Sequence, residues 1–263
     1  MRGDDAESSG YHPVTMRDQL SLRLEPDVPT LPNLPATLRP MLPRPLPEPF
    51  DSTDHLFEPS WGGLRALAFV GPAEEAGSGD VRLIDGSGVE LGGALPELAG
   101  LAVRLDARSA VLDGELVVVD ANGLADAEEL RRRLAGERGR PVAFLAFDLL
   151  HLDGRSLLSA PLDRRRALLR RVLRPCDEVV AVPAIAGEGR ALYDAAAAQG
   201  IAGVMARQRS SPYLPGVRSR LWRFIAATPG AATEGLAEVP LDAPGPAAAP
   251  VLALISRLPL EDL

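Results

Sequence analysis

Residues 57–65 read Phe-Glu-Pro-Ser-Trp-Gly-Gly-Leu-Arg, and the rest of the chain is best interpreted outward from this stretch. Its second half enters a short apolar run, Leu64 to Val70, and a second apolar run follows from Asp80 to Asp85. Glycines bound both runs, and such runs are typical of strands joined by a loop rich in turn residues. The sequence therefore predicts two consecutive strands directly after residues 57–63.

Further elements follow in the same way. Apolar runs predict strands at residues 110–120 and 144–152, and the second run is followed by Asp-Gly at residues 153–154. Helical spacing of apolar residues predicts helices at residues 96–105, 126–134, 162–173 and 189–199, two of them starting at a proline and the last ending at a glycine. In the helix at 162–173 we expect Leu168, Leu169 and Val172 to face inward, with six arginines (Arg164, Arg165, Arg166, Arg170, Arg171 and Arg174) around its polar side.

Length and composition set limits on the function. The 263 residues suffice for one large domain or two small subdomains. Neither a secretory signal nor a membrane span is expected, and the single Cys176 excludes an internal disulfide, so we expect a cytoplasmic protein. Three scattered histidines give no metal-ligand spacing, and we expect no metal site. A net charge of −8 argues against strong sequence-independent DNA binding.

Residues 57–65 resemble the first signature motif of the ATP-dependent DNA ligases, in particular the bacterial end-joining type. That motif reads Phe-Glu-Pro-Lys-Trp-Asp-Gly-Tyr-Arg, and its lysine attacks the α-phosphorus of ATP. Here Ser60 stands at the lysine position and Gly62 at the aspartate position. The later motifs are similar to residues 113–115, 144–154 and 200–207, in the family's order.

The resemblance implies an α+β fold of two subdomains of mainly antiparallel sheet flanked by helices, with a nucleotide cleft between them. We assign residues 38–227 to a ligase-like adenylation domain, residues 1–37 to a flexible Pro-rich arm and residues 228–263 to an Ala/Pro-rich tail. The ligases continue with an oligonucleotide-binding barrel, which needs about 50 residues or more. We expect no such barrel in the 36 residues after Ala227.

The resemblance also implies site residues. Glu58, Arg65, Glu115 and Phe147 match the family, and Arg207 stands at a lysine position, so these five are the expected nucleotide-binding residues. Phe147 would stack on adenine, although a single aromatic in an apolar run is as readily an ordinary core residue. Other positions depart from the family: Ser60, Gly62 and Gly86, then Ala202 at a metal-binding glutamate and Phe224 and Ala226 at phosphate-binding lysines.

The chemistry depends on lysine, and the chain contains none, because its 28 basic residues are all arginines. A lysine amine becomes nucleophilic when its pKa falls towards neutrality, whereas a guanidinium stays protonated and is a poor nucleophile. Serine would give a phosphodiester far less activated than the phosphoramidate that the family passes to DNA. We therefore assign no catalytic residue and expect no self-adenylation. ATP and Mg²⁺ are implied by the resemblance, but at a degraded site.

Three hypotheses remain open. The chain is a degenerate ligase that serves DNA repair or end joining by binding nucleotide or DNA, a protein-interaction platform built on the ligase fold, or an enzyme of altered chemistry. The expected partners are nicked or broken DNA, bound weakly, and other DNA-repair proteins, with no membrane. Residues 201–225 carry five arginines, Arg218 and Arg220 among them, and no acid. We expect Arg218 and Arg220 to contact DNA phosphates, unless arginine merely replaces lysine throughout the chain.

Overall fold

The structure, a computed structural model, describes residues 34–73, 79–91 and 95–227. All of them belong to one compact unit, Leu31–Leu263. The expected tail, and the expected arm apart from residues 34–37, lie outside the described residues. No helix in the described ranges is long and apolar enough to cross a membrane.

The larger sheet, here sheet B, has the strand order β4-β3-β5-β6-β7, and β8 pairs with β6 in parallel. Its strands are β3 (Leu64–Ala73), β4 (Gly79–Asp85), β5 (Ala110–Val117), β6 (Ala143–Leu152), β7 (Arg155–Ser156) and β8 (Val179–Ala181). Neighbours along the main path are antiparallel. The 3₁₀ helix η2 (Pro96–Arg104) and helix α2 (Leu162–Val172) bury leucines and valines against one face of this sheet, which forms the largest core.

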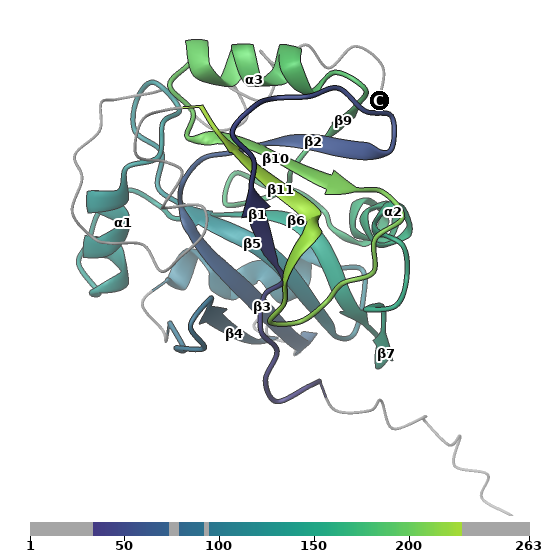
Figure 1. Ribbon diagram of the computed structural model, residues 1–263. Helices are drawn as coiled ribbons and strands as arrows, with labels where there is room; N and C mark the ends of the chain where they lie inside the picture. The colour runs from purple at the N-terminus through teal and green to yellow at the C-terminus, as the bar shows by residue number, and fades with distance from the viewer. Residues whose placement is uncertain (1–33, 74–78, 92–94, 228–263) are drawn as a thin grey trace, which may run out of the picture. The chain divides into compact units, whose positions relative to one another are not determined.

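The smaller sheet, here sheet A, has the strand order β1-β11-β10-β2-β9. Its strands are β1 (Leu42–Pro45), β2 (His55–Ser60), β9 (Ile185–Ala186), β10 (Gly203–Gln208) and β11 (Arg218–Ala226). Helix α3 (Gly189–Ala198) packs Leu192 and Ala196 on it and lies on the side of sheet A away from sheet B (Figure 1). The first strand, β1, joins the last, β11, in parallel, with the N–H groups of Leu42 and Leu46 donating to carbonyls of 217 and 224.

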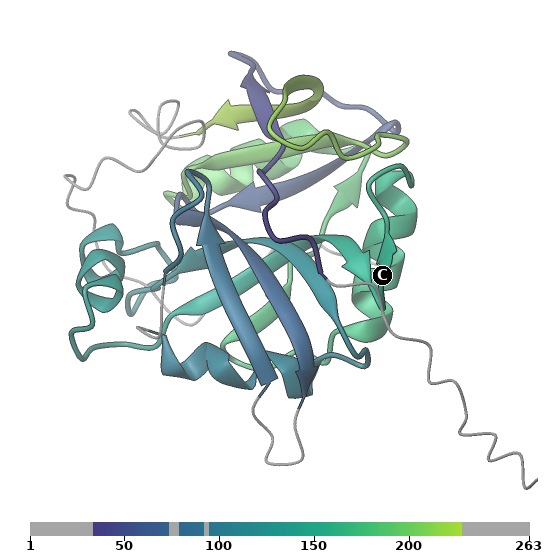
Figure 2. The ribbon, with the colours of Figure 1, turned by 90° about the horizontal axis from the view of Figure 1, so that it is seen from below.

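The stretch at 57–65 is the passage from one sheet to the other. It begins in β2 of sheet A and enters β3 of sheet B after residues 61–63, and Figure 2 shows the two sheets as separate groups of strands. Gly62 has a φ of +79°, a conformation that residues with a Cβ seldom adopt. At Gly63 a Cβ would stand 2.2 Å from the Leu116 carbonyl oxygen. The two glycines therefore let the chain cross tightly against β5.

Helix α1 (Ala127–Leu134) lies beside this crossing. Asp126 caps it by accepting a hydrogen bond of 2.9 Å from the Glu129 N–H, which satisfies one of the free donors of the first turn.

The α+β fold of two sheets with flanking helices is confirmed. Two details of the expectation differ. The helix expected at 96–105 is a 3₁₀ helix, whose i→i+3 bonds suit a short segment. The placing of Arg165 and Arg166 on the polar side of α2 was wrong, because both are fully buried. Each guanidinium meets a buried carboxylate, Arg165 that of Asp148 and Arg166 that of Glu58, and this pairing lets an arginine enter the core.

Candidate functional site

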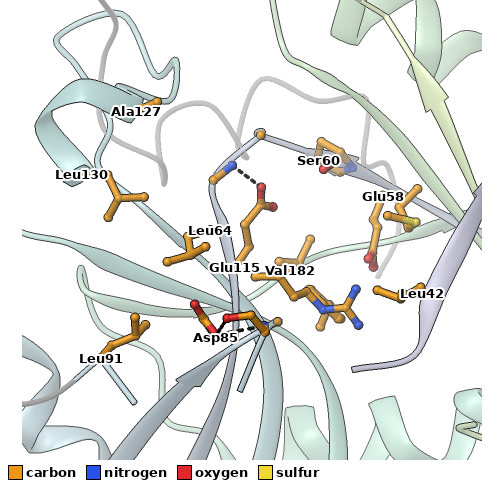
Figure 3. Close-up of a pocket in the computed structure, with 18 of the residues that line it drawn as sticks. Leu42, Glu58, Ser60, Leu64, Asp85, Leu91, Glu115, Ala127, Leu130 and Val182 are labelled. Carbon is orange, nitrogen blue, oxygen red and sulfur yellow. Dashed lines mark hydrogen bonds between the residues drawn. The ribbon is translucent and has the colours of Figure 1, made fainter. Parts of the chain in front are cut away.

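A cavity of about 730 Å³ opens between the two sheets. Sheet A contributes Glu58 and Ser60 from β2, Met205 and Arg207 from β10, and Leu42 and Arg218 from β1 and β11. Sheet B contributes Leu64, Arg65, Glu115 and Phe147, and α1 contributes Ala127, Leu130 and Leu134. Figure 3 shows the leucines at 64, 91 and 130 on one side of the cavity and Glu58 and Ser60 on the other. Leucines are therefore concentrated on one side of the cavity, where Asp85 and Arg131 also line it, and Glu58 and Ser60 lie on the other side.

All five expected nucleotide-binding residues, Glu58, Arg65, Glu115, Phe147 and Arg207, line this cavity. Of the two expected DNA-binding residues, Arg218 lines it and Arg220 does not. Both arginines are exposed on β11. Arg218 also donates a hydrogen bond of 3.0 Å to the Pro43 carbonyl of the neighbouring strand β1.

Ser60, at the position of the family's nucleophile, is the last residue of β2 and is paired with Gly203 of β10. The other departures from the family pattern gather near it. Gly62 and Gly86 line the same cavity, and a Cβ on Gly62 would stand 3.0 Å from that of Ala202. The expected nucleotide-binding residues and the positions that depart from the family pattern therefore lie close together in the fold.

Three of those substitutions form a small apolar cluster. Phe224 packs with Met205 in the core, and Ala202 and Ala226 pack against the pair. We call these four residues the Met205 cluster. At these three positions the family has a carboxylate that binds metal and two lysines that bind phosphate. This chain has apolar side chains there, and they pack with Met205. The described residues contain no group of three or more His, Cys, Asp or Glu able to hold a metal ion.

Glu58 forms ion pairs with two arginines, Arg166 and Arg207. All three side chains are 2% exposed, and Arg166 also donates to the Val182 carbonyl at 2.5 Å. Burial lowers the pKa of Arg166 to about 10 and that of Arg207 to about 9, because the charged form loses its water. Both guanidiniums stay charged at neutral pH. One carboxylate thus faces two cations, so this group has a formal charge of +1.

Phe147 lies at an irregularity in the pairing of β5 with β6, where Asp113 faces Asp148 but Gly114 faces Ala146. Such a bulge turns a side chain away from the regular alternation. The ring lines the cavity yet is only 5% exposed. The Arg207 guanidinium carbon lies 3.9 Å from its centroid and 4.6 Å from that of Trp222, while Arg65 lies further away at 4.9 Å from Phe147.

Arg65 is held by a carboxylate of sheet B. Its Nε and Nη2 donate to the two oxygens of Asp113 at 2.7 and 2.6 Å, and Nη2 also donates to the Met41 carbonyl at 3.1 Å. The Tyr213 hydroxyl donates to Asp113 at 2.6 Å, and burial raises the pKa of that hydroxyl well above its usual value. These bonds tie β3 and β5 to the segment that leads into β1.

Glu115 holds the turn between the sheets. Its Oε1 accepts a hydrogen bond of 2.5 Å from the Gly63 N–H, drawn as a dashed line in Figure 3. Burial raises the pKa of this carboxyl, and hydrogen bonds from the backbone N–H groups of Trp61, Gly62 and Gly63 oppose that rise. The carboxylate therefore fixes the backbone that positions Ser60.

The sequence analysis placed Arg166 on the polar side of its helix and matched Asp113 to a family motif without giving it a role, although a signal for buried cations existed. A carboxylate inside an apolar strand, such as Asp148 in residues 144–150, needs a buried partner, and the arginine-rich helix at 162–173 was the nearest source.

Comparison with known proteins identifies the family. A family model described as the ATP dependent DNA ligase domain matches residues 50–224. The chain belongs to this family. The resemblance to the ATP-dependent DNA ligases, first seen at residues 57–65, is thereby confirmed.

The relatives include end-joining proteins. The multifunctional non-homologous end joining DNA repair protein LigD of Mycobacterium tuberculosis is 37% identical over 166 residues, covering 63% of this chain and 21% of LigD. A probable DNA ligase of Rhodococcus opacus is 36% identical over 150 residues, 56% of this chain and 30% of that protein. A solved structure, mycobacterial DNA ligase D complexed with ATP and MES, aligns with a TM-score of 0.62 at 32% identity, over 72% of this chain and 60% of that one. The chain thus spans about a fifth of the length of LigD.

Proposed function

We propose that this chain is a ligase-like domain that serves DNA end joining or repair without forming a lysyl-adenylate. The observation that carries the proposal is Ser60, which stands at the nucleophile position in the cavity of a chain without lysine. The similarity to LigD supports a role in end joining. Binding of nucleotide or DNA, rather than covalent catalysis, is the activity that we propose.

The cavity argues against a metal-bound triphosphate. The Met205 cluster replaces the family's metal carboxylate and phosphate cations with apolar side chains, which offer no ligand to Mg²⁺ and no charge to a phosphate. Arg65 and Glu115 are already engaged, the first with Asp113 and the second with the backbone at residue 63. We therefore derive no step through ATP or Mg²⁺ for this chain.

Intact-mass spectrometry tests the proposal. The protein is incubated with ATP and Mg²⁺, beside a lysine-containing ligase domain that serves as the positive control. We expect no change in mass, because the nucleophile that forms the phosphoramidate is missing. A covalent AMP adduct of about 329 Da on this chain would overturn the proposal.

DNA binding is the second part of the proposal. Arg218 and Arg220 are exposed on β11, and Arg44 of the adjoining strand β1 is exposed as well. Cations on neighbouring strands suit the phosphate backbone, which binds without reading sequence. We propose modest affinity for nicked duplex that falls with salt, by a slope of about −0.9 per neutralised phosphate.

Fluorescence anisotropy with labelled nicked duplex measures this binding. Arg218→Ala and Arg220→Ala should each weaken it to the same degree on unrelated sequences. Arg155→Ala is the matched control, because Arg155 is exposed on β7 of the other sheet. No binding by the wild type at about 50 mM salt, where such contacts are strong, would instead favour the interaction platform.

A further inference from the structure

Arg207 occupies the place where a stacked base would be expected. Its guanidinium carbon lies 3.9 Å from the centroid of Phe147 and 4.6 Å from that of Trp222. A guanidinium is planar and stacks on aromatic rings. Phe147 is left only 5% exposed although it lines the cavity. The ring that the family uses for adenine is therefore already in contact with a planar cation of the same chain.

We propose that Arg207 is a specificity-determining residue that closes the stacking face of Phe147, so that the cavity excludes purine bases. The inference rests on the proposed function and narrows it. Of the nucleotide and DNA binding proposed above, it excludes purine nucleotides from the cavity and leaves DNA bound at the exposed arginines of β11. Arg207 was expected to contact nucleotide, whereas in this proposal its side chain prevents a purine base from stacking on Phe147.

The backbone fixes Arg207 in this place. β10 is an inner strand of sheet A, and Arg207 faces Leu56 of β2 on one side and Trp222 of β11 on the other. Trp222, which is fully buried, is both its partner in the strand register and one of the two rings beside its guanidinium. The position cannot shift without breaking two antiparallel ladders at once.

The charges hold the side chain as well. Arg207 pairs with Glu58, whose carboxylate also pairs with Arg166, and all three are 2% exposed. A guanidinium that left Phe147 would have to leave this carboxylate or pull it along. An uncharged base entering the cavity offers no replacement counter-ion. Displacing Arg207 is therefore costly, and adenine gains only the stacking contact in return.

Removal of the Arg207 side chain should allow a purine base to reach Phe147 without leaving a buried charge unpaired. In an Arg207→Ala variant the Glu58–Arg166 pair remains, which is formally neutral, so no carboxylate is left buried alone. The face of Phe147 is freed. Base–aromatic stacking contributes about 1–3 kcal/mol, and about 1.4 kcal/mol corresponds to a tenfold change in affinity.

The experiment titrates adenosine, which has no phosphate, and therefore reports on the base site independently of self-adenylation. Binding is followed by calorimetry and by tryptophan fluorescence. We expect no saturable binding by the wild type and affinity at least about tenfold higher in Arg207→Ala. Adding Phe147→Ala to that variant should abolish the gain. Arg209→Ala is the control, because it removes an arginine two residues away whose partner, Asp163, does not line the cavity.

Two results would overturn the inference. One is adenosine binding by the wild type that Phe147→Ala abolishes, since the ring would then be open. The other is a folded Arg207→Ala variant, checked by circular dichroism, that gains no affinity. If Arg207→Ala does not fold, Arg207→Val, whose short β-branched side chain suits an inner strand, is titrated in its place. An AMP adduct in the mass experiment would contradict the proposed function. It would not change the outcome of the adenosine titration, so the failures of the two proposals can be distinguished.

Discussion

Removing Arg165 of α2 should be among the most destabilising single changes at the contact between this helix and sheet B. Its Nε and Nη2 donate to the two oxygens of Asp148 at 2.8 and 2.7 Å, and both side chains are 0% exposed. Its Nη1 donates to the carbonyls of Ala160 and Ser211 at 2.5 and 2.9 Å. The guanidinium thereby joins β6, the start of α2 and the loop before β11.

The magnitude follows from what Arg165→Met leaves behind. Asp148, whose pKa burial already raises, would lose its only ion-pair partner in the described structure, and two buried carbonyls would lose a donor. Breaking a buried ion pair from one side costs about 3–5 kcal/mol. The double variant Asp148→Asn/Arg165→Met leaves no uncompensated charge, so it should recover a large part of that loss.

Urea unfolding, followed by circular dichroism, measures the free energy of unfolding of the wild type, both single variants and the double variant. Arg209→Met is the control, because its pair with Asp163 is 42% and 43% exposed and should contribute no more than about 1 kcal/mol. A loss below about 1 kcal/mol for Arg165→Met would refute the reasoning. So would a double variant as unstable as the sum of the two single changes.

Three further predictions concern the cavity. Because burial raises the pKa of Glu115 above its ordinary value of 4.5, the stability of the wild type relative to Glu115→Gln should fall as pH rises above 4.5. Urea unfolding between about pH 4 and 7 checks this, and a constant difference would contradict it. Gly63→Ala places a Cβ 2.2 Å from the Leu116 carbonyl oxygen, so it should lower the free energy of unfolding by about 1–3 kcal/mol and reduce the melting temperature. An unchanged melting temperature would show that the crossing is loose. Ser60→Lys alone should give no AMP adduct by mass spectrometry, because the Met205 cluster still lacks the metal and phosphate ligands, each worth about 2.7–4 kcal/mol by analogy with other preorganised contacts. An adduct on this variant would show that lysine is the one missing part.

Local patterns were sufficient for the long strands of sheet B and for the helices, whereas the strands of sheet A were not predicted from them and the two-sheet fold came from the family resemblance. Apolar runs placed β3, β5 and β6, and helical spacing placed α1 and α3, because each depends on residues close in sequence. Arg165 shows where this reasoning fails. A charged residue on a short amphipathic helix is expected to face water, and its burial depends on Asp148, which lies on a different element. Pairing between distant elements leaves little trace in local periodicity.

The site shows the same division. The motif at 57–65 and the Asp-Gly-Glu at 113–115 were recognised, and residues of both, Glu58 and Glu115 among them, line one cavity. What the residues do there depended on distances that no motif contains. Glu115, expected to contact nucleotide, accepts a hydrogen bond from the backbone N–H of Gly63, a role that the motif did not indicate. Phe147 is almost fully buried, as a core residue is, and it also lines the cavity, because a bulge in β6 turns it. Its stacking on adenine stays a prediction of the resemblance.

The parallel pairing of β1 with β11 has a consequence for how sheet A meets other molecules. β1 is an outer strand, and its sequence is Leu-Pro-Arg-Pro. The N–H groups of Leu42 and Leu46 donate hydrogen bonds to β11. Pro43 and Pro45 lie between these two residues and have no N–H group. The outer rim of the sheet thus lacks donors at two positions and carries the charge of Arg44, features that discourage edge-to-edge aggregation. At the opposite rim β9 has only two residues. A protein partner of sheet A should therefore recognise side chains on a face, because neither rim offers a continuous backbone template for an added strand.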